Sequence, residues 1–213
     1  MKVYSKAVIV GASRDGDLAL KGIDTALIIA ADGGYTALKE IGVTPSIVLG
    51  DFDSGEKPEF DNVIKLPVEK DDTDTVYAVK LALENGIRDI ELYRCLGGDR
   101  LDHTVATLQT LSYIVSHGGS GVAYGDASED GKRLVVRALK DGNLTLSGDY
   151  TGILSVFAVS DCKGVTIRNV KYPLEDAELA PDFPLGVSNA FINGKRAEIS
   201  VTHGTLIIMY REA

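Results

Sequence analysis

The sequence lacks several features that mark specialised classes of protein. It has no tryptophan, and its two cysteines, Cys95 and Cys162, are far apart and without the spacing of a metal site. We therefore expect both cysteines to be reduced core residues of a cytoplasmic protein. No apolar run reaches the roughly 18 residues that a membrane helix needs, and the first residues lack the apolar block of a signal peptide.

Basic charge is also scarce. The formal net charge is −9, and lysine and arginine form no dense block. This balance argues against a surface that binds nucleic acid or an anionic membrane. It does not exclude a small phosphate ligand, because a metal ion can bridge acidic side chains to phosphate groups.

Three common nucleotide-binding or hydrolase motifs are missing as well. No Gly-x-x-x-x-Gly-Lys-Ser/Thr loop occurs, which excludes a P-loop kinase. No Gly-x-Gly-x-x-Gly follows the first apolar run, so a dinucleotide fold of the Rossmann type is not expected. No Gly-x-Ser-x-Gly elbow is present, which argues against a serine hydrolase.

Short apolar runs alternate with helical patterns in the first part of the chain. Because this alternation is typical of parallel strands joined by helices, residues 1–127 are predicted to form a layered α/β domain with a mainly parallel sheet. The expected strands are 7–10, 25–31, 47–49, 63–67, 90–96 and 122–124, and the expected helices are 35–41, 75–84 and 99–116.

Beyond Gly125 the pattern changes to short β-like runs with turn signals between them. Residues 128–213 are therefore predicted to form an all-β sandwich, after a polar, glycine-rich linker near 125–132. Asp141-Gly142, Ser147-Gly148 and Asn193-Gly194 are expected to be turns, and 175–179 a helical turn. The expected strands are 133–138, 143–146, 152–159, 164–170, 197–201 and 206–210.

Acidic residues follow four of the expected strands. The carboxyl ends of parallel strands meet at one edge of a sheet, so these side chains are expected to converge on one cleft. Such a cleft predicts a magnesium site, with Lys70 and Arg100 beside it to contact phosphate. The pairs Gly33-Gly34 and Gly97-Gly98 are expected to leave room for a ligand. The acids are Asp32, Asp51, Asp53, Asp71, Asp72, Asp74, Asp99 and Asp102.

Simpler explanations stay open at several positions. A single aspartate after a strand, such as Asp15 or Asp99, is often a turn or capping residue. Asp51 and Asp53 together need a metal ion, a basic partner or a shared proton. His103 can satisfy the first turn of a helix as well as bind a ligand. Ser188-Asn189 can be only a turn.

The order of these motifs resembles that of the thiamine pyrophosphokinase family, over nearly the whole chain. In the first half the likeness rests on Asp32-Gly33-Gly34, Gly50-Asp51-Phe52-Asp53-Ser54, Lys70-Asp71-Asp72-Thr73-Asp74 and Gly97-Gly98 with Arg100-Leu101-Asp102-His103. In the second half it rests on Gly186-Val187-Ser188-Asn189-Ala190-Phe191 and Gly204-Thr205-Leu206.

The resemblance implies an enzyme that transfers the pyrophosphoryl group of ATP to thiamine, giving thiamine diphosphate and AMP. It also implies an α/β domain that holds nucleotide and magnesium, followed by a β-sandwich for thiamine binding and dimerisation. The active sites of such a homodimer lie at its interface, where the β domain of the partner contacts thiamine. Two alternatives remain: a related magnesium-dependent pyrophosphokinase or phosphohydrolase acting on another small alcohol, and a non-catalytic nucleotide- or thiamine-binding module.

The resemblance also implies roles for individual residues. The magnesium–triphosphate would be surrounded by Asp51, Asp53, Asp71 and Asp74. Asp71 or Asp74 would orient the substrate hydroxyl or accept its proton, and the sequence does not decide between them. Nucleotide and phosphates would be bound by Asp32, Gly33, Lys70, Thr73, Arg100 and His103. Asp102 would lie near the phosphates as a catalytic residue, together with the four acids around the magnesium. The thiamine pyrimidine would lie near Ser188 and Asn189.

The chain departs from the family pattern at three places. Asp99 stands where a second glycine is expected directly before the arginine. Thr107 is the nearest match to an asparagine expected in the following helix. Since no tryptophan is present, aromatic stacking on thiamine would have to use tyrosine or phenylalanine. These departures affect local substrate contacts more than the class of reaction.

Overall fold

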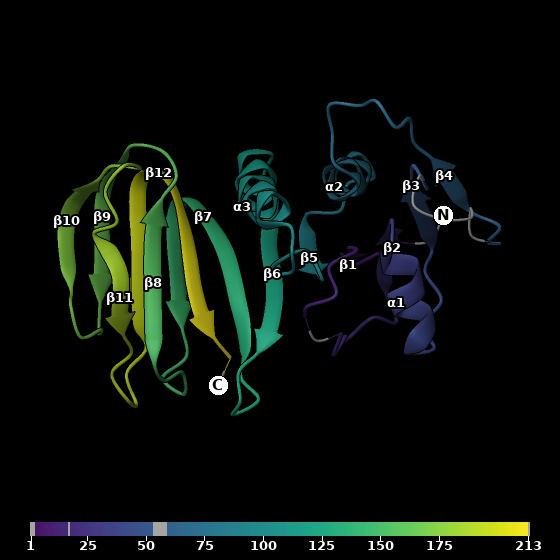
Figure 1. Cartoon of the computed structure of the whole chain (residues 1–213). Helices are drawn as coiled ribbons and strands as arrows, with labels where there is room; N and C mark the ends of the chain where they lie inside the picture. The colour runs from purple at the N-terminus through teal and green to yellow at the C-terminus, as the bar shows by residue number, and fades with distance from the viewer. Residues whose placement is uncertain (1–2, 17, 53–58, 213) are drawn as a thin grey trace.

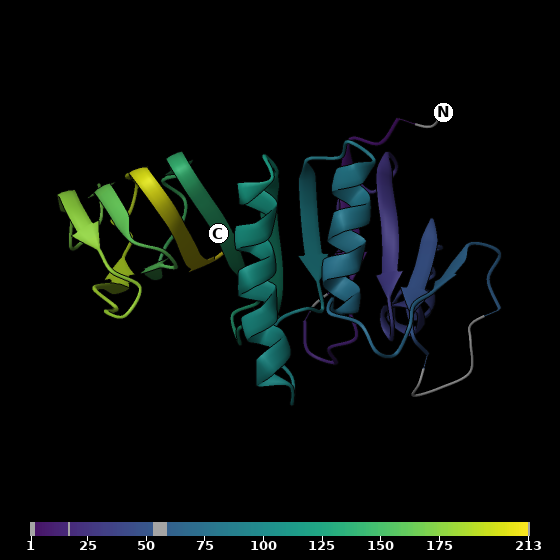
Figure 2. The same cartoon turned by 90° about the horizontal axis from the view of Figure 1, so that it is seen from above.

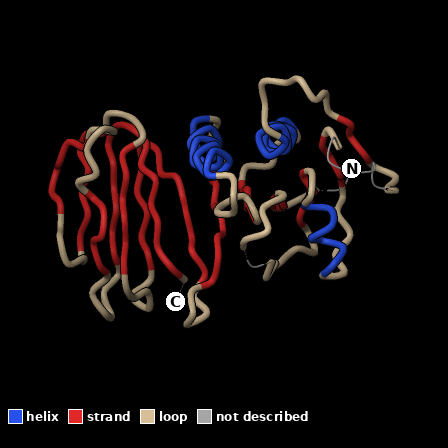
Figure 3. The backbone as a smooth tube through the Cα atoms, in the orientation of Figure 1, coloured by secondary structure: helices blue, strands red, loops and turns tan. Residues whose placement is uncertain are grey.

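A layered α/β region lies beside a β-sandwich in the computed structural model, which describes residues 3–16, 18–52 and 59–212 (Figure 1). The predicted fold class is confirmed. In Figure 3 the described helices lie against the α/β region, whereas the sandwich consists of strands and loops.

The α/β region is built on a parallel sheet with the order β6-β5-β1-β2-β3-β4. The central strand β1 pairs with β2 and β5, so that Val8 lies opposite Ile28 on one side and Glu91 on the other. The chain therefore passes outward from β1 to β4 and then crosses back to β5. The strands are β1 (Lys6–Val10), β2 (Ala26–Ala31), β3 (Ile47–Gly50), β4 (Val63–Lys65), β5 (Asp89–Tyr93) and β6 (Ser120–Ala127).

Helices cover both faces of this sheet. Successive side chains of a strand point to opposite faces, which explains the unbroken apolar run of β1. Ala7 and Ile9 pack with α2 (Asp74–Glu84) and α3 (Leu101–Ser116), whereas Val8 and Val10 pack with α1 (Gly34–Glu40). Figure 2 shows α2 and α3 side by side over one face.

Two long strands join the layers of the sandwich. The first part of β12 pairs with β9, and the second part of β12 pairs with β8. On its other side, β12 pairs with β7 along both parts. Apolar residues of both layers form one core between them. The strands are β7 (Arg133–Leu146), β8 (Ile153–Ala158), β9 (Cys162–Arg168), β10 (Leu174–Leu179), β11 (Gly186–Ala190) and β12 (Ala197–Arg211).

The turn predicted at Asp141-Gly142 is wrong. Residues 133–138 and 143–146 belong to one strand, and so do 197–201 and 206–210. Asp141 has a positive φ of 44°, and its carboxylate accepts a hydrogen bond from the nitrogen of Gly204, at a shift in the β7–β12 register. The residue types that favour turns here form a β-bulge, which bends the paired strands from one layer into the other.

The helical turn predicted at 175–179 is also wrong, because this segment is strand β10 paired with β9. Its register shifts twice, and Asp176, within the first shift, has a positive φ of 48°. Leu174, Ala177 and Leu179 still pack against the sandwich core. The bulges therefore change the spacing of the apolar residues from the period of two that identifies a strand.

The predicted domain boundary falls between β6 and β7. These strands pair antiparallel, with Val122 opposite Arg137, so the sheet continues from the α/β region into the sandwich. The stretch expected to be a linker contains the last residues of β6 and the turn of this hairpin, and the boundary itself stays a prediction. Cys95 and Cys162 are buried and unpaired, as expected. No helix of the described residues is long and apolar enough to span a membrane.

Candidate active site

The sheet has its crevice at the carboxyl ends of β1 and β5. These neighbouring strands are followed by connections that leave in opposite directions, one toward β2 and the other toward β6. Open α/β sheets bind ligands at such a reversal of strand order. A cleft of about 540 Å³ opens there, lined by the loop that follows β1, the loop that follows β5 and the first turns of α3.

Several of the predicted site residues line this cleft. They are Asp32, Thr73, Arg100 and His103. Thr73 also caps α2, since its hydroxyl accepts a hydrogen bond from the nitrogen of Val76 at 3.2 Å. One side chain therefore both begins the helix and faces the cleft. Of the carboxylates predicted to converge here, Asp32 and Asp99 belong to the described lining of this cleft.

Two half-buried acids, Asp51 and Asp74, lie next to Lys70. Its ammonium lies 3.0 Å from Asp51 Oδ2 and 3.1 Å from Asp74 Oδ1. These side chains come from the end of β3, the loop before α2 and the first residue of α2. Lys70 thus supplies the basic partner that two close carboxylates need.

Burial and charge act together on this group. Burial raises the pKa of the Asp74 carboxyl, and the charges of Asp51 and Asp32 raise it further against the lowering effect of Lys70. Burial lowers the pKa of Lys70, but its hydrogen bonds to the two aspartates outweigh burial and raise the pKa overall. Asp32, Asp51 and Asp74 therefore form one electrostatic cluster beside the cleft.

The predicted ligands Asp53 and Asp71 are not part of this cluster as described. Asp53 lies outside the described residues, and Asp71 is exposed. The neighbouring Asp72 forms an ion pair of 2.7 Å with Lys80. Within the described residues, no three acidic, histidine or cysteine side chains are close enough to hold a metal ion.

Arg100 and Asp102 pair with each other at the start of α3. The guanidinium donates two hydrogen bonds to the carboxylate, from Nε at 3.0 Å and from Nη2 at 2.8 Å. These bonds lower the pKa of Asp102 to about 2. Both side chains remain open to solvent, with exposures of 66% and 65%. Arg100 is therefore oriented by Asp102 and accessible to an anion in the cleft.

The glycine pairs differ in their role. A Cβ at Gly34 would lie 2.0 Å from the carbonyl oxygen of Val10, so its space is taken by β1. A Cβ at Gly33 would contact Ala12. The room predicted here for a ligand is thus filled by the protein. Gly97 and Gly98 have φ values of 77° and 76° and do line the cleft.

Ser188 and Asn189 lie in β11, a strand of the sandwich that is far from β1 and β5 (Figure 1). The Asn189 side chain is 4% exposed and makes hydrogen bonds with both the nitrogen and the oxygen of Tyr172. It therefore holds the backbone in place. The Ser188 nitrogen donates to the hydroxyl of Ser155, which lines a second, largely apolar cleft of about 350 Å³ with Ile153 and Met209.

Sequence reasoning missed part of the cleft lining. Ser13, Arg14 and Asp15 come shortly after β1, and a polar run after an apolar strand is the signal that identifies them. Arg94 was counted within an expected strand, but β5 ends at Tyr93. Arg94 has a positive φ of 53°, which turns its side chain into the cleft wall.

Two family models match the chain in sequence order. One is described as thiamin pyrophosphokinase, catalytic domain, and matches residues 22–120. The other is described as thiamin pyrophosphokinase, vitamin B1 binding domain, and matches residues 143–206. The chain belongs to the thiamine pyrophosphokinase family.

Individual members of the thiamine pyrophosphokinase family agree with this. A thiamine pyrophosphokinase of Bacillus subtilis is 28% identical over 192 residues, which cover 86% of each chain. The structure of a thiamin pyrophosphokinase from Geobacillus thermodenitrificans has 25% identity and a TM-score of 0.79, over 97% of each chain. The family and the class of enzyme predicted from the motifs are confirmed.

The fold is shared with more distant members. A thiamin pyrophosphokinase structure from Candida albicans reaches a TM-score of 0.75 at 14% identity, covering 98% of this chain and 90% of that one. The catalytic model includes the buried acid cluster and most of the cleft lining, whereas the vitamin B1 model includes Ser188 and Asn189.

Proposed function

We propose that the chain transfers the pyrophosphoryl group of ATP to the hydroxyl of thiamine, giving thiamine diphosphate and AMP. The observation that carries the proposal is the catalytic family match over residues 22–120, which contribute both the acid cluster and most of the main cleft. The cytoplasmic location expected from the sequence is part of this proposal, in agreement with the two unpaired cysteines.

ATP would occupy the cleft of about 540 Å³ between the β1 and β5 loops. The guanidinium groups of Arg14, Arg94 and Arg100 line it and carry the charge that phosphate oxygens require. The backbone of Gly97 and Gly98 lets a phosphate approach closely. His103, in the first turn of α3, lies beside the same phosphates.

Two carboxylates of the acid cluster, Asp51 and Asp74, are the described residues that would contact magnesium next to this cleft. The buried Oδ1 of Asp74 lies 3.1 Å from the Lys70 ammonium but makes no well-aligned hydrogen bond with the described residues. Carboxylate oxygens already surround one cation there, and magnesium prefers such ligands together with substrate phosphates. Asp51 and Asp74 would hold the ion with Asp32 nearby, and Asp53 and Asp71 complete the proposed set. The ion would neutralise charge on the triphosphate.

The protein would then act mainly by placing the reactants. Attack at the β-phosphorus needs the thiamine hydroxyl in line with the leaving AMP, and little covalent help from the enzyme. Asp71 or Asp74 would orient that hydroxyl or accept its proton. Arg100, held by Asp102, would bind a phosphate oxygen whose charge grows during the transfer.

Thiamine would be bound between two copies of the chain. The second cleft is largely apolar, lies beside Ser188 and shares no lining residue with the main cleft. The Ser188 hydroxyl makes no hydrogen bond with the described residues, so it is available to the pyrimidine. A homodimer that places this surface against the main cleft of the partner would complete each site.

The test is AMP release from magnesium-ATP, measured with thiamine and with other small alcohols. The proposal predicts that thiamine supports release far better than the other alcohols. Faster release with another alcohol would assign the chain to a related pyrophosphokinase. Tight binding of ATP and thiamine by calorimetry without turnover would make it a binding module.

A further inference from the structure

One wall of the main cleft is held partly from outside the α/β region. Residues 12–15, here called the loop wall, begin the connection between β1 and β2. On the α/β side, the Ser13 nitrogen donates to the oxygen of Arg94 at 3.0 Å, and the Asp15 carboxylate accepts a hydrogen bond from Gly98. These contacts tie the loop wall to the opposite side of the cleft.

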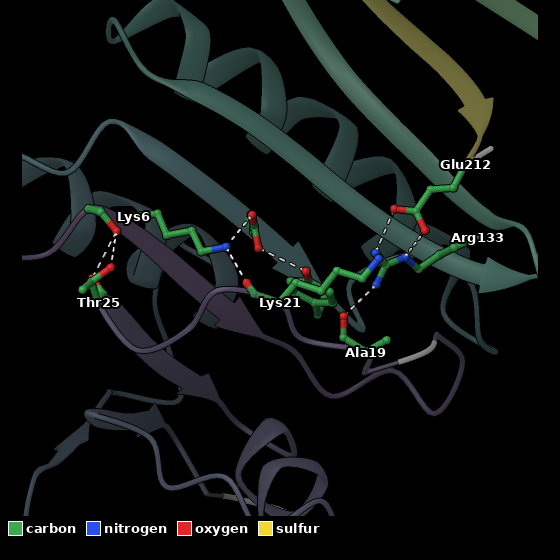
Figure 4. A network of polar contacts seen from close by, with 9 residues as sticks. Lys6, Ala19, Lys21, Thr25, Arg133 and Glu212 are labelled. Atoms are coloured by element: carbon green, nitrogen blue, oxygen red, sulfur yellow. Dashed lines mark hydrogen bonds and ion pairs between the residues drawn. The ribbon is translucent and has the colours of Figure 1, made fainter. Parts of the chain in front are cut away.

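The next contacts of this connection come from the β6–β7 hairpin. The nitrogen of Gly16 donates to the carboxylate of Asp126, near the end of β6. The carbonyl oxygen of Ala19 accepts a hydrogen bond of 3.2 Å from Nη1 of Arg133, the first residue of β7. Figure 4 shows Arg133 between Ala19 and Glu212. The segment that carries the loop wall therefore rests on the start of the sandwich.

Arg133 itself is fixed on every side. It is 4% exposed, and its guanidinium donates to both carboxylate oxygens of Glu212, at 3.2 and 2.9 Å. Its charge lies over the ring of Tyr124 at 4.1 Å and that of Tyr93 at 5.6 Å. The Glu212 nitrogen also donates to the oxygen of Arg133. These contacts fix the orientation of the guanidinium, so that its Nη1 stays in position to donate to the carbonyl oxygen of Ala19.

A second anchor holds the far end of the same connection. The Lys6 ammonium donates to the oxygen of Lys21 at 2.8 Å and to the carboxylate of Glu91 at 2.8 Å (Figure 4). On either side of Ala19, Leu18 and Leu20 pack against the core around α1. The connection that follows the loop wall is thus held by Arg133 at Ala19 and by the α/β region at its other described contacts.

We propose that Arg133 and Glu212 are positioning residues that hold the loop wall in the shape that binds the nucleotide. Neither residue lines the cleft, and both act through the carbonyl of Ala19. The inference rests on the proposed function, because the ligand of the cleft is taken to be magnesium-ATP. Arg133 at the start of β7 and Glu212 after β12 would thereby contribute to the site of the α/β region.

The test compares two variants. The double variant Arg133→Met/Glu212→Leu removes the donor to Ala19 without leaving a buried charge unpaired, which single changes would do. Arg137→Met is the matched control, because Arg137 lies on the same strand and donates to Tyr210 at 3.0 Å without contact to the loop wall. Both are assayed for thermal midpoint, for hydrogen exchange of residues 13–20, and for KM and kcat with magnesium-ATP.

We expect the double variant to speed exchange in residues 13–20 and to raise the KM for ATP about fivefold, the order expected for one lost hydrogen bond. Its kcat should stay within about twofold of the unchanged chain, since no group that touches the reacting atoms is removed. The Arg137→Met control should leave exchange and KM unchanged. An unchanged KM in the double variant, or an equal rise in the control, would overturn the proposal.

The exchange measurement separates this inference from the proposed function. It needs no substrate, so it reports on the loop wall even if the chain releases no AMP. Faster exchange in the double variant without turnover in any form would contradict the proposed reaction and support the anchoring role. Unchanged exchange together with normal thiamine-dependent turnover would remove the anchoring role and leave the reaction standing.

Discussion

At the scale of single residues, the carboxylate of Asp74 has the most unusual surroundings in the site. It is largely buried, it lies 3.1 Å from Lys70, and its pKa is raised above the ordinary value. The proposed mechanism uses its charge, either on magnesium or near the substrate hydroxyl. The protein therefore keeps a costly buried acid where the reaction needs one.

Replacing this acid tests its role. We expect Asp74→Asn to lower kcat for AMP release by about 100-fold or more, the usual range for a lost catalytic acid or base. Asp72→Asn is the control, since Asp72 pairs with Lys80 and does not line the cleft, and it should keep kcat within about threefold. Comparable activity in Asp74→Asn and the unchanged chain would remove the acid cluster from the mechanism.

Arg100 tests the binding of phosphate. Arg100→Lys keeps the positive charge but loses the fork that Asp102 holds in place through two hydrogen bonds. We expect the KM for ATP to rise about tenfold, as for a weakened charged hydrogen bond. Arg168→Lys, in an exposed pair with Glu175 on the sandwich, should change nothing. A normal KM in Arg100→Lys would place the triphosphate elsewhere.

Whether a site residue could be predicted depended on whether the end of the strand before it can be recognised in the sequence. Asp32 and Asp51 directly follow apolar strands, so their place at the sheet edge followed from strand order alone. Arg94 continues an apolar run, and only the pairing of β5 with β1 shows that the strand has ended. The sequence specifies the type of each side chain, but the tertiary contacts that orient the side chain toward the cleft cannot be recognised in it.

At the scale of elements, the same limit appears in the sandwich. The layered α/β order and the β-rich second half were predictable, because they depend on local apolar periodicity. The joining of residues 133–146 into one bent strand was not. The bulge at Asp141 depends on Gly204, which lies 63 residues away in sequence and donates to its carboxylate. Local turn chemistry cannot distinguish a bulge from a hairpin in such a case.

Because of the bulge, we expect the stability of the protein to be sensitive to substitution of Gly204. Gly204 has a φ of 110°, and a Cβ there would lie 2.6 Å from the oxygen of Asp161 and 2.7 Å from the sulfur of Cys162. We expect Gly204→Ala to lower the free energy of unfolding by roughly 3 kcal/mol, from backbone strain and overpacking. Urea denaturation measures this change.

Gly142→Ala is the control for this substitution. It lies in the same pair of strands, but the nearest atom to its Cβ would be 3.4 Å away. The unfolding free energy should change by about 0.5 kcal/mol or less. Equal stability of the Gly204 and Gly142 variants would show that the bulge does not require a glycine at position 204.

At the scale of the whole molecule, the two clefts lie on different parts of one chain, and the proposed reaction needs both. Mixing two inactive variants tests whether they meet between copies. Asp74→Asn damages the main cleft, and Ser188→Trp fills the space beside the second cleft. After unfolding and refolding together, mixed dimers would each hold one intact site, restoring about a quarter of the activity of the unchanged chain.

The refolding experiment has a direct control. Each variant refolded alone should stay inactive, and sedimentation should show a dimer in every sample. Absence of restored activity in a mixture that forms dimers would mean that both clefts of one site belong to the same chain. A monomer at assay concentration would contradict the shared site altogether.

The central claim is that pyrophosphoryl transfer to thiamine takes place in the cleft between the β1 and β5 loops. The most direct measurement follows AMP and thiamine diphosphate together from ATP, with and without thiamine and with and without magnesium. The account predicts equal amounts of the two products, formed only when thiamine and magnesium are both present. AMP formed at the same rate without thiamine would contradict it.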